Sequence, residues 1–114
     1  MSGKGRIFTY DQTLEIFPSV RDLTATAVRS VEAVFNQVQS RDEMELRREE
    51  LQSTVDGIVQ EWADEVTAMG CEVKGLWLVD WNCGNGYYCW RYPEMSVSFF
   101  HSYEDGFVGR VPVN

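Results

Sequence analysis

The residues that could do chemistry are concentrated in the last third of the chain. Between Leu76 and the end, seven acidic, basic or histidine side chains lie among many aromatic residues: Asp80, Arg91, Glu94, His101, Glu104, Asp105 and Arg110. Since His101 is the one histidine in the sequence, any imidazole chemistry must use it. A guanidinium binds anions well, and a carboxylate can orient an imidazole. One hypothesis is therefore a small polar cleft in which Arg110 binds an anion, and Glu94 or Asp80 orients His101.

The same residues also allow a purely structural interpretation. An ion pair between Arg110 and a carboxylate, with a hydrogen-bonded His101, would fasten the C-terminal tail to a sheet. Arg110 lies in the segment 106–112, where two glycines allow the chain to fold back. We favour this structural interpretation, because such a pair joins a loop to a sheet without any ligand. Asp80, Glu94, His101 and Arg110 remain the candidate ligand-binding residues, and no residue is predicted to be catalytic.

The cysteines offer a weaker signal for chemistry. Cys71, Cys83 and Cys89, with His101, could form a Cys₃His zinc site, but their spacings of twelve and six residues contain no close pair. Reduced thiols that act as small apolar groups are the simpler interpretation. A catalytic pair of Cys89 and His101 lacks the electropositive surroundings that lower a thiol pKa. We therefore predict no metal and no cofactor.

Charge and hydropathy exclude several classes of partner. The 114 residues carry 10 Lys and Arg against 18 Asp and Glu, a net charge of −8. Phosphate backbones and anionic lipids repel such a surface, so we expect no nucleic-acid and no membrane partner. No apolar run approaches the roughly 18 residues that span a bilayer. The first six residues are not followed by an apolar stretch of the kind found in signal peptides, so we expect a cytoplasmic protein.

Residues 9–70 are expected to form two long helices in an antiparallel hairpin. Thr9 is typical of an N-cap, and Asp11 places an acid in the first turn. Pro18 either kinks this first helix or begins a new one. Apolar residues then recur at helical spacing: Val20, Leu23, Ala27, Val31, Val34 and Val38.

The second helix is predicted to begin at the capping-box sequence Ser40-x-x-Glu43 and to run for about 27 residues. Gly70 is typical of the residue that follows a helix end. Between Asp42 and Glu65, nine acids face only two bases. This helix either has a solvated acidic face or presents an acidic surface to a basic partner. We favour the solvated face.

Residues 71–114 are expected to form a sheet and a C-terminal tail. Leu76–Trp81, Tyr87–Tyr92 and Ser96–His101 are rich in β-branched and aromatic residues, and Asn85-Gly86 is typical of a hairpin turn. The sequence therefore predicts an α+β fold: a long antiparallel helical hairpin, followed by a three-stranded antiparallel β-meander packed on it. We expect residues 1–114 to form a single domain.

The predicted sheet has more apolar residues than one face can hold. In the third strand, His101 shares its face with Val97 and Phe99, which places it near the core side. The first two strands are apolar on both faces, so the face away from the helices needs the C-terminal tail, a second subunit or a ligand as cover. We expect a non-enzymatic interaction or assembly module that forms a homodimer. The alternative is an anion-binding protein or enzyme that uses the polar cleft.

Several short motifs give the chain a family resemblance. The residues that carry it are Glu72-Val73-Lys74-Gly75, Leu76–Trp81, Cys89-Trp90-Arg91, Glu94, Phe100-His101 and the Gly106-Phe107-x-Gly-Arg110-x-Pro112 tail, with Arg6–Tyr10 and Phe17–Val20 near the start. They resemble the bacterial domain-of-unknown-function family 2203, whose tail reads approximately V-K-D, G-L-V-D-F, C-W-x-x-G-E, W-H and G-F-x-G-R-x-P. The chain departs from this pattern at Gly75, Trp81, Tyr92-Pro93 and Phe100. The resemblance implies no particular activity and no catalytic residues.

Overall fold

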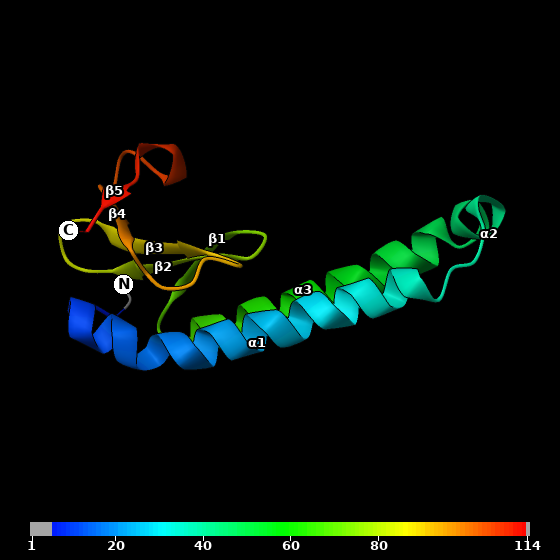
Figure 1. Ribbon diagram of the computed structural model, residues 1–114, viewed down its shortest axis with the longest axis horizontal. Helices are drawn as coiled ribbons and strands as arrows, with labels where there is room; N and C mark the ends of the chain where they lie inside the picture. Colours follow the sequence, from blue (N-terminus) through cyan, green and yellow to red (C-terminus); the bar gives the residue numbers. More distant parts are fainter. Residues whose placement is uncertain (1–5, 114) are drawn as a thin grey trace.

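The computed structural model describes residues 6–113 and has three α-helices and five strands (Figure 1). The elements, in chain order, are α1 Tyr10–Asn36, α2 Arg41–Leu46, α3 Arg48–Ala68, β1 Glu72–Gly75, β2 Leu78–Asn82, β3 Tyr87–Arg91, β4 Phe99–His101, the 3₁₀ turn Phe107–Gly109 and β5 Val111–Pro112. The α+β class is as predicted. Among the described residues, no helix is long and apolar enough to cross a lipid bilayer.

The first helix begins at the predicted cap. Thr9 Oγ1 accepts a hydrogen bond from the Gln12 amide at 3.0 Å, and Gln12 Oε1 accepts one from the Thr9 amide at 2.9 Å. Two of the amides that a helix start leaves unpaired are thereby satisfied. Pro18 lies inside α1, so no new helix begins there. Figure 1 shows that the axis of α1 bends in its N-terminal part, as a proline inside a helix favours.

The predicted second helix is two helices. Ser40 caps α2, because its Oγ accepts from the Glu43 amide at 3.0 Å. The predicted capping box is incomplete, since the Glu43 carboxylate accepts from the Gln39 amide at 2.9 Å and not from the Ser40 amide. The helix then breaks at Arg47, whose φ of −104° and ψ of 12° depart from α geometry before α3 begins. Arg47 forms ion pairs with Glu43 at 3.0 Å and Glu50 at 3.1 Å, one on each side of the break. The prediction of one helix of about 27 residues is wrong here, because apolar spacing does not detect a single non-helical residue.

The sheet has five antiparallel strands in the order β1-β2-β3-β4-β5, so the prediction of three strands is wrong. The two missed strands are the edges. β1 has four residues and β5 only two, and neither is long enough for a clear alternation. The predicted strand at Leu76 begins instead at Leu78, because Trp77 has a φ of 59° in the turn from β1.

One face of the sheet packs on the helical hairpin. Val79 pairs with Trp90, and Trp81 with Tyr88, in the register of β2 and β3. Val79, Trp81 and Trp90 are fully buried. They pack with buried residues of the two long helices: Phe17 and Val20 of α1, and Trp62 and Val66 of α3. Phe17 meets Trp90 edge-on at a centroid distance of 5.2 Å, and Trp62 meets Trp77 at 4.9 Å. These aromatic contacts join helices and sheet in one core.

The other face, which we call the outer face, is more polar than predicted. The antiparallel register places Glu72 opposite Asp80 and Asp80 opposite Cys89 on this face. The prediction that both faces are apolar is therefore wrong in part, since the outer face combines Leu78, Tyr87 and Cys89 with the charged Glu72 and Asp80. The chain's own C-terminal segment, residues 102–113, covers part of the outer face, on the side of the sheet away from the helices (Figure 1). The C-terminal tail was one of the three covers that the sequence left open.

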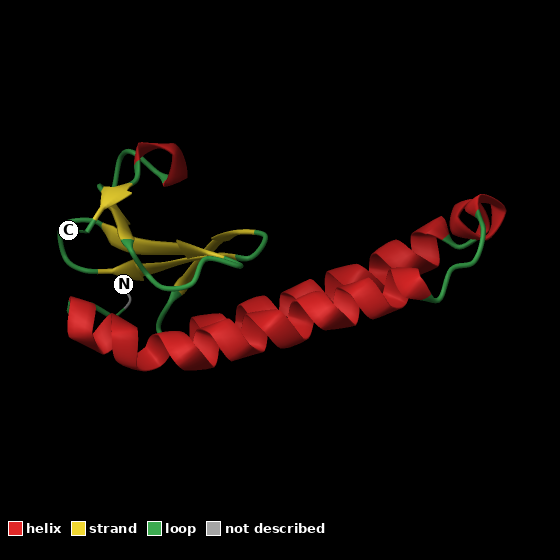
Figure 2. Ribbon diagram, viewed as in Figure 1, coloured by secondary structure: helices red, strands yellow, loops and turns green. Residues whose placement is uncertain are grey.

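The helical hairpin is longer than the sheet that it supports. Figure 2 shows α1 and α3 side by side, with one end of the hairpin projecting well beyond the strands. We call residues 28–60 the distal arm. Within it Leu51 is the one buried side chain, whereas Phe35 is 41% exposed and Leu46 is 87% exposed. The distal arm therefore has a thin apolar core.

Candidate functional site

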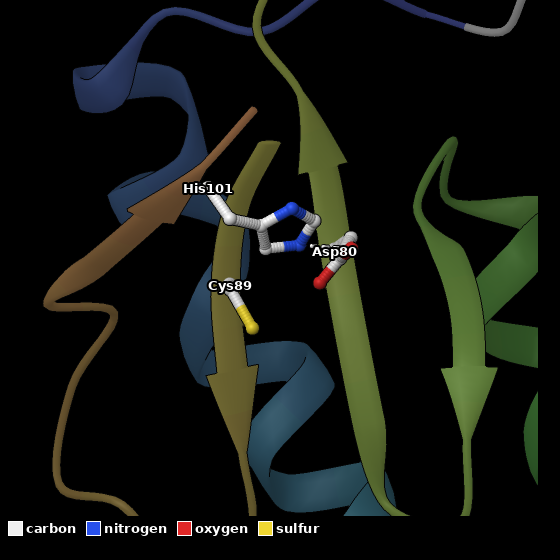
Figure 3. Close-up of side chains that lie close together, drawn as sticks. All are labelled: Asp80, Cys89 and His101. Carbon is white, nitrogen blue, oxygen red and sulfur yellow. Dashed lines mark hydrogen bonds and ion pairs between the residues drawn. The ribbon is translucent and has the colours of Figure 1, made fainter. Parts of the chain in front are cut away.

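Three buried side chains from neighbouring strands converge on the outer face (Figure 3). They are Asp80 of β2, Cys89 of β3 and His101 of β4, and one ligand atom from each lies within 4.8 Å of the others. The register places Asp80 directly opposite Cys89. It places His101 opposite Tyr87, one diagonal step from Cys89. We call these three residues the Asp–Cys–His cluster.

His101 is held between two hydrogen-bond acceptors. Its Nδ1 lies 2.8 Å from the Ser102 carbonyl oxygen, and its Nε2 lies 2.9 Å from Asp80 Oδ2. A carbonyl oxygen only accepts, so Nδ1 carries a proton and donates it. Nε2 faces a carboxylate, so a second proton must lie between Nε2 and Oδ2. Without a metal ion the pair is thus an imidazolium with a carboxylate, or an imidazole with a carboxylic acid.

Burial shapes the chemistry of the other two members. Asp80 is 1% exposed, and no described protein group donates a hydrogen bond to its Oδ1 atom. Burial raises the pKa of Asp80, and the neighbouring His101 opposes that rise. Burial, together with the nearby Asp80 carboxylate, raises the pKa of Cys89 to about 12. As a free thiol, Cys89 is therefore protonated and unreactive at neutral pH.

A cleft of about 260 Å³ opens above Asp80 and His101. The sheet forms its floor and the C-terminal segment forms one wall, with the lining residues Lys74, Leu78, Asp80, His101, Tyr103, Gly106 and Phe107. Lys74 supplies the cation at this cleft. Its Nζ lies 3.8 Å from Asp80 Oδ2, 3.5 Å from Glu72 Oε1 and 3.8 Å from the centre of the Tyr87 ring.

Glu94 and Arg110, the other two candidate residues, form a separate ion pair. Both guanidinium NH₂ groups of Arg110 donate to the Glu94 carboxylate, at 3.1 and 2.8 Å. The guanidinium also lies 4.1 Å from the ring centres of both Phe99 and Phe107. A guanidinium engaged in this way fastens the C-terminal segment to the sheet. The hydrogen bonds that Arg110 donates to Glu94 raise the pKa of the Arg110 guanidinium above its ordinary value.

The structure therefore divides the four candidate residues into two pairs. Asp80 with His101 lines the cleft, whereas Glu94 with Arg110 does not. The prediction that Val97 and Phe99 share the face of His101 is wrong in part. Phe99 and His101 lie on the outer face, but β4 begins only at Phe99, and Val97 lies before it in the helix-side core.

Sequence reasoning missed two contributors to the cluster and its cleft. Cys89 was considered as a nucleophile and as part of a Cys₃His set, but not together with Asp80, and Lys74 was not considered. The signal that could have found Cys89 is the strand register, because a hairpin closed near Asn85-Gly86 places Cys89 close to Asp80. The Cys₃His set does not assemble, since the one potential metal-binding group in residues 6–113 is Asp80, Cys89 and His101. Burial raises the pKa of Cys71 to about 12 at its own site in the core.

Comparison with known proteins identifies the family. A family model described as "Uncharacterized conserved protein (DUF2203)" matches residues 6–113. The chain belongs to this family. Searches of curated proteins and of solved structures returned no match.

Membership of DUF2203 confirms the resemblance stated from the short motifs. All three members of the Asp–Cys–His cluster lie in the stretches that carried that resemblance: Leu76–Trp81, Cys89-Trp90-Arg91 and Phe100-His101. The description of the DUF2203 family names no activity.

Proposed function

We propose that the protein is a non-enzymatic assembly module that forms a homodimer through its distal arm. The observation that carries this proposal is the thin core of the arm, where Leu51 is the one buried side chain in residues 28–60 and Phe35 is 41% exposed. Two helices alone leave part of their apolar stripes in water, whereas four helices bury them. A second hairpin would complete the missing half of such a bundle.

Charge favours the α1 side of the arm and a second copy of this chain. Between Leu23 and Asn36, α1 carries only Arg29 and Glu32, which balance. Helix α3 carries six acids against Arg48, so two α3 faces would repel each other. Packing α1 against α1 of a second copy covers the Phe35 region without that repulsion. A cytoplasmic location belongs to the same proposal, supported by three unpaired cysteines.

Light scattering during gel filtration at micromolar concentration tests the dimer. We expect a particle of twice the 13.1 kDa chain mass. Phe35→Asp should shift the protein to the monomer mass, because it places a charge in the proposed interface. Circular dichroism should show that the variant keeps its helices.

Ala33→Asp is the matched control. Ala33 is exposed on the same helix, about 200° around the axis from Phe35, and receives the same charge. It should leave the dimer intact. A monomeric wild-type protein would exclude the proposed assembly, and equal loss of the dimer in both variants would exclude this face of α1.

The cleft supports a second candidate function, the binding of a small anion. The cleft of about 260 Å³ is large enough for a small anion. Lys74, which lines it together with His101, supplies a positive charge. The role first considered for Arg110 passes to Lys74, because the Arg110 guanidinium is held by Glu94. Asp80 would orient His101.

Thermal unfolding with phosphate or acetate tests anion binding. A ligand at 100 times its Kd should stabilise the wild-type protein by about 2.7 kcal/mol. Lys74→Ala should abolish the stabilisation, whereas Arg110→Ala should melt earlier and yet retain it. Stabilisation of Lys74→Ala by the anion would contradict this candidate function. So would the absence of stabilisation in the wild-type protein and both variants.

A further inference from the structure

We propose that the Asp–Cys–His cluster binds a divalent transition-metal ion of the zinc class. The ligands would be a carboxylate oxygen of Asp80, Sγ of Cys89 and Nε2 of His101. Nitrogen, thiolate and carboxylate ligands in one set suit zinc and its neighbours better than magnesium or calcium, which prefer oxygen alone. The site is independent of the proposed dimer, because it lies on the outer face of the sheet and the distal arm does not contribute to it.

The orientation of His101 is the first argument. Histidine ligands usually donate one ring N–H to a carbonyl or carboxylate, which directs the lone pair of the other nitrogen at the metal. His101 has this arrangement, since Nδ1 donates to the Ser102 carbonyl and Nε2 points at Asp80 Oδ2. Two acceptors that face each other need a cation between them. A metal ion fills that role as well as a proton does.

The unpartnered oxygen of Asp80 is the second and independent argument. Asp80 is 99% buried, and no described residue donates a hydrogen bond of standard geometry to its Oδ1. Besides His101 and Lys74, the group that acts on the carboxylate is the thiol of Cys89, itself a proposed ligand. A buried carboxylate oxygen without a partner is costly, and such atoms in folded proteins call for an explanation. A metal ion bound by the Asp80 carboxylate would remove the penalty.

The distances between the three ligand atoms fit a tetrahedral zinc site after small movements of the side chains. Zinc holds its ligand atoms at about 2.0–2.3 Å, so atoms at the corners of its tetrahedron lie about 3.3–3.8 Å apart. The three ligand atoms lie within 4.8 Å of one another, and Nε2 is 2.9 Å from Oδ2. Insertion of the ion therefore separates His101 from Asp80 and draws Cys89 inward, with movements of about 1 Å or less.

Charge also balances when the ion binds. Two protons leave, one from the Cys89 thiol and one from between His101 and Asp80. The ion then meets a thiolate, a carboxylate and a neutral imidazole, which together cancel its two positive charges. Three protein ligands leave a fourth position on the ion. Asp80 and His101 line the cleft, so this position faces it and can hold water or a small ligand.

Lys74 is the competitor that the ion must overcome. Its ammonium lies 3.8 Å from Asp80 Oδ2 and opposes a second cation there. The side chain is 36% exposed and also pairs with Glu72, so it can stay with Glu72 when the ion enters. A cluster with a purely structural role would show no such competition between Lys74 and a metal ion. Removal of the Lys74 charge should tighten metal binding.

Titration of metal-stripped protein with Co²⁺ tests the proposal. We expect one equivalent to bind and to produce the near-ultraviolet charge-transfer band of a cobalt–thiolate bond, with Zn²⁺ displacing it. Cys89→Ser should lose the band, and the matched variants Cys71→Ser and Cys83→Ser should keep it. No band in the wild-type protein would overturn the proposal, as would a band that survives in Cys89→Ser.

A second variant keeps the test decisive if Cys89→Ser fails to fold. Lys74→Gln should bind Co²⁺ about fivefold more tightly or better, from the loss of one opposing charge at about 4 Å. Arg21→Gln removes an exposed charge from α1 and should leave the affinity unchanged. Equal or weaker binding by Lys74→Gln would contradict the proposed position of the ion.

Discussion

Trp62→Ala should lower the free energy of unfolding by about 3–5 kcal/mol, the range for deletion of a buried aromatic side chain. Trp62 is 2% exposed and lies where the helical hairpin meets the sheet. Its ring packs edge-on against Trp77, and its Nε1 donates to Thr24 Oγ1 at 2.8 Å. The substitution leaves a cavity, removes an aromatic contact and deprives Thr24 of its donor.

Urea unfolding followed by circular dichroism measures this loss. Leu46→Ala is the control, because Leu46 is 87% exposed at the tip of the hairpin and should change stability by no more than about 0.5 kcal/mol. A similar small effect for both variants would show that the hairpin and the sheet do not share the core described above.

His101→Leu should destabilise the metal-free protein by about 3–5 kcal/mol, the typical loss when one partner of a buried ion pair is removed. The Asp80 carboxylate, which is 1% exposed, would then lose its hydrogen bond from His101 and keep only Lys74, at 3.8 Å, as a charged partner. Replacing both partners by apolar residues removes the stranded charge. Asp80→Leu/His101→Leu should therefore be more stable than His101→Leu alone, by about 1 kcal/mol or more.

The same unfolding experiment, in the presence of a chelator, measures all three variants. Asp80→Leu alone completes the double-mutant cycle and isolates the coupling between the two side chains. If the two single losses simply add in the double variant, Asp80 and His101 do not act as a pair, and the assigned hydrogen bond contributes little.

The helices were largely predictable because their signals are local. The N-caps at Thr9 and Ser40 and the helix end before Gly70 each depend on residues within one turn. Gly70 has the positive φ of 95° expected after a helix. The break at Arg47 was not predictable, because a single residue with altered dihedral angles leaves the apolar spacing on either side unchanged.

The sheet was less predictable because strand faces depend on register. The alternation of Ser96, Val97, Ser98 and Phe99 predicts one regular strand, but the chain before Phe99 is irregular, and the side assigned to His101 changes. Edge strands of two and four residues carry too little pattern to be detected. These two strands can be identified only from the neighbouring strands with which they pair.

The candidate residues were found, but their grouping was not. Asp80 and His101 are 21 positions apart, and only the pairing of three strands brings them together. Gly86 is part of this arrangement, since a Cβ there would lie 2.5 Å from the His101 carbonyl oxygen. The sequence shows a glycine in a turn, but the close approach that requires it becomes visible only in three dimensions.

The way the C-terminal segment is fastened bears on how ions and small ligands reach the buried cluster. This segment forms one wall of the cleft, and the contacts of Arg110 with Glu94, Phe99 and Phe107 hold it to the sheet. A short segment held by an ion pair opens by local unfolding, at a lower free energy than the aromatic core. Salt weakens such a pair but leaves apolar contacts intact. We therefore expect added salt to ease the opening of this wall of the cleft more than it destabilises the aromatic core.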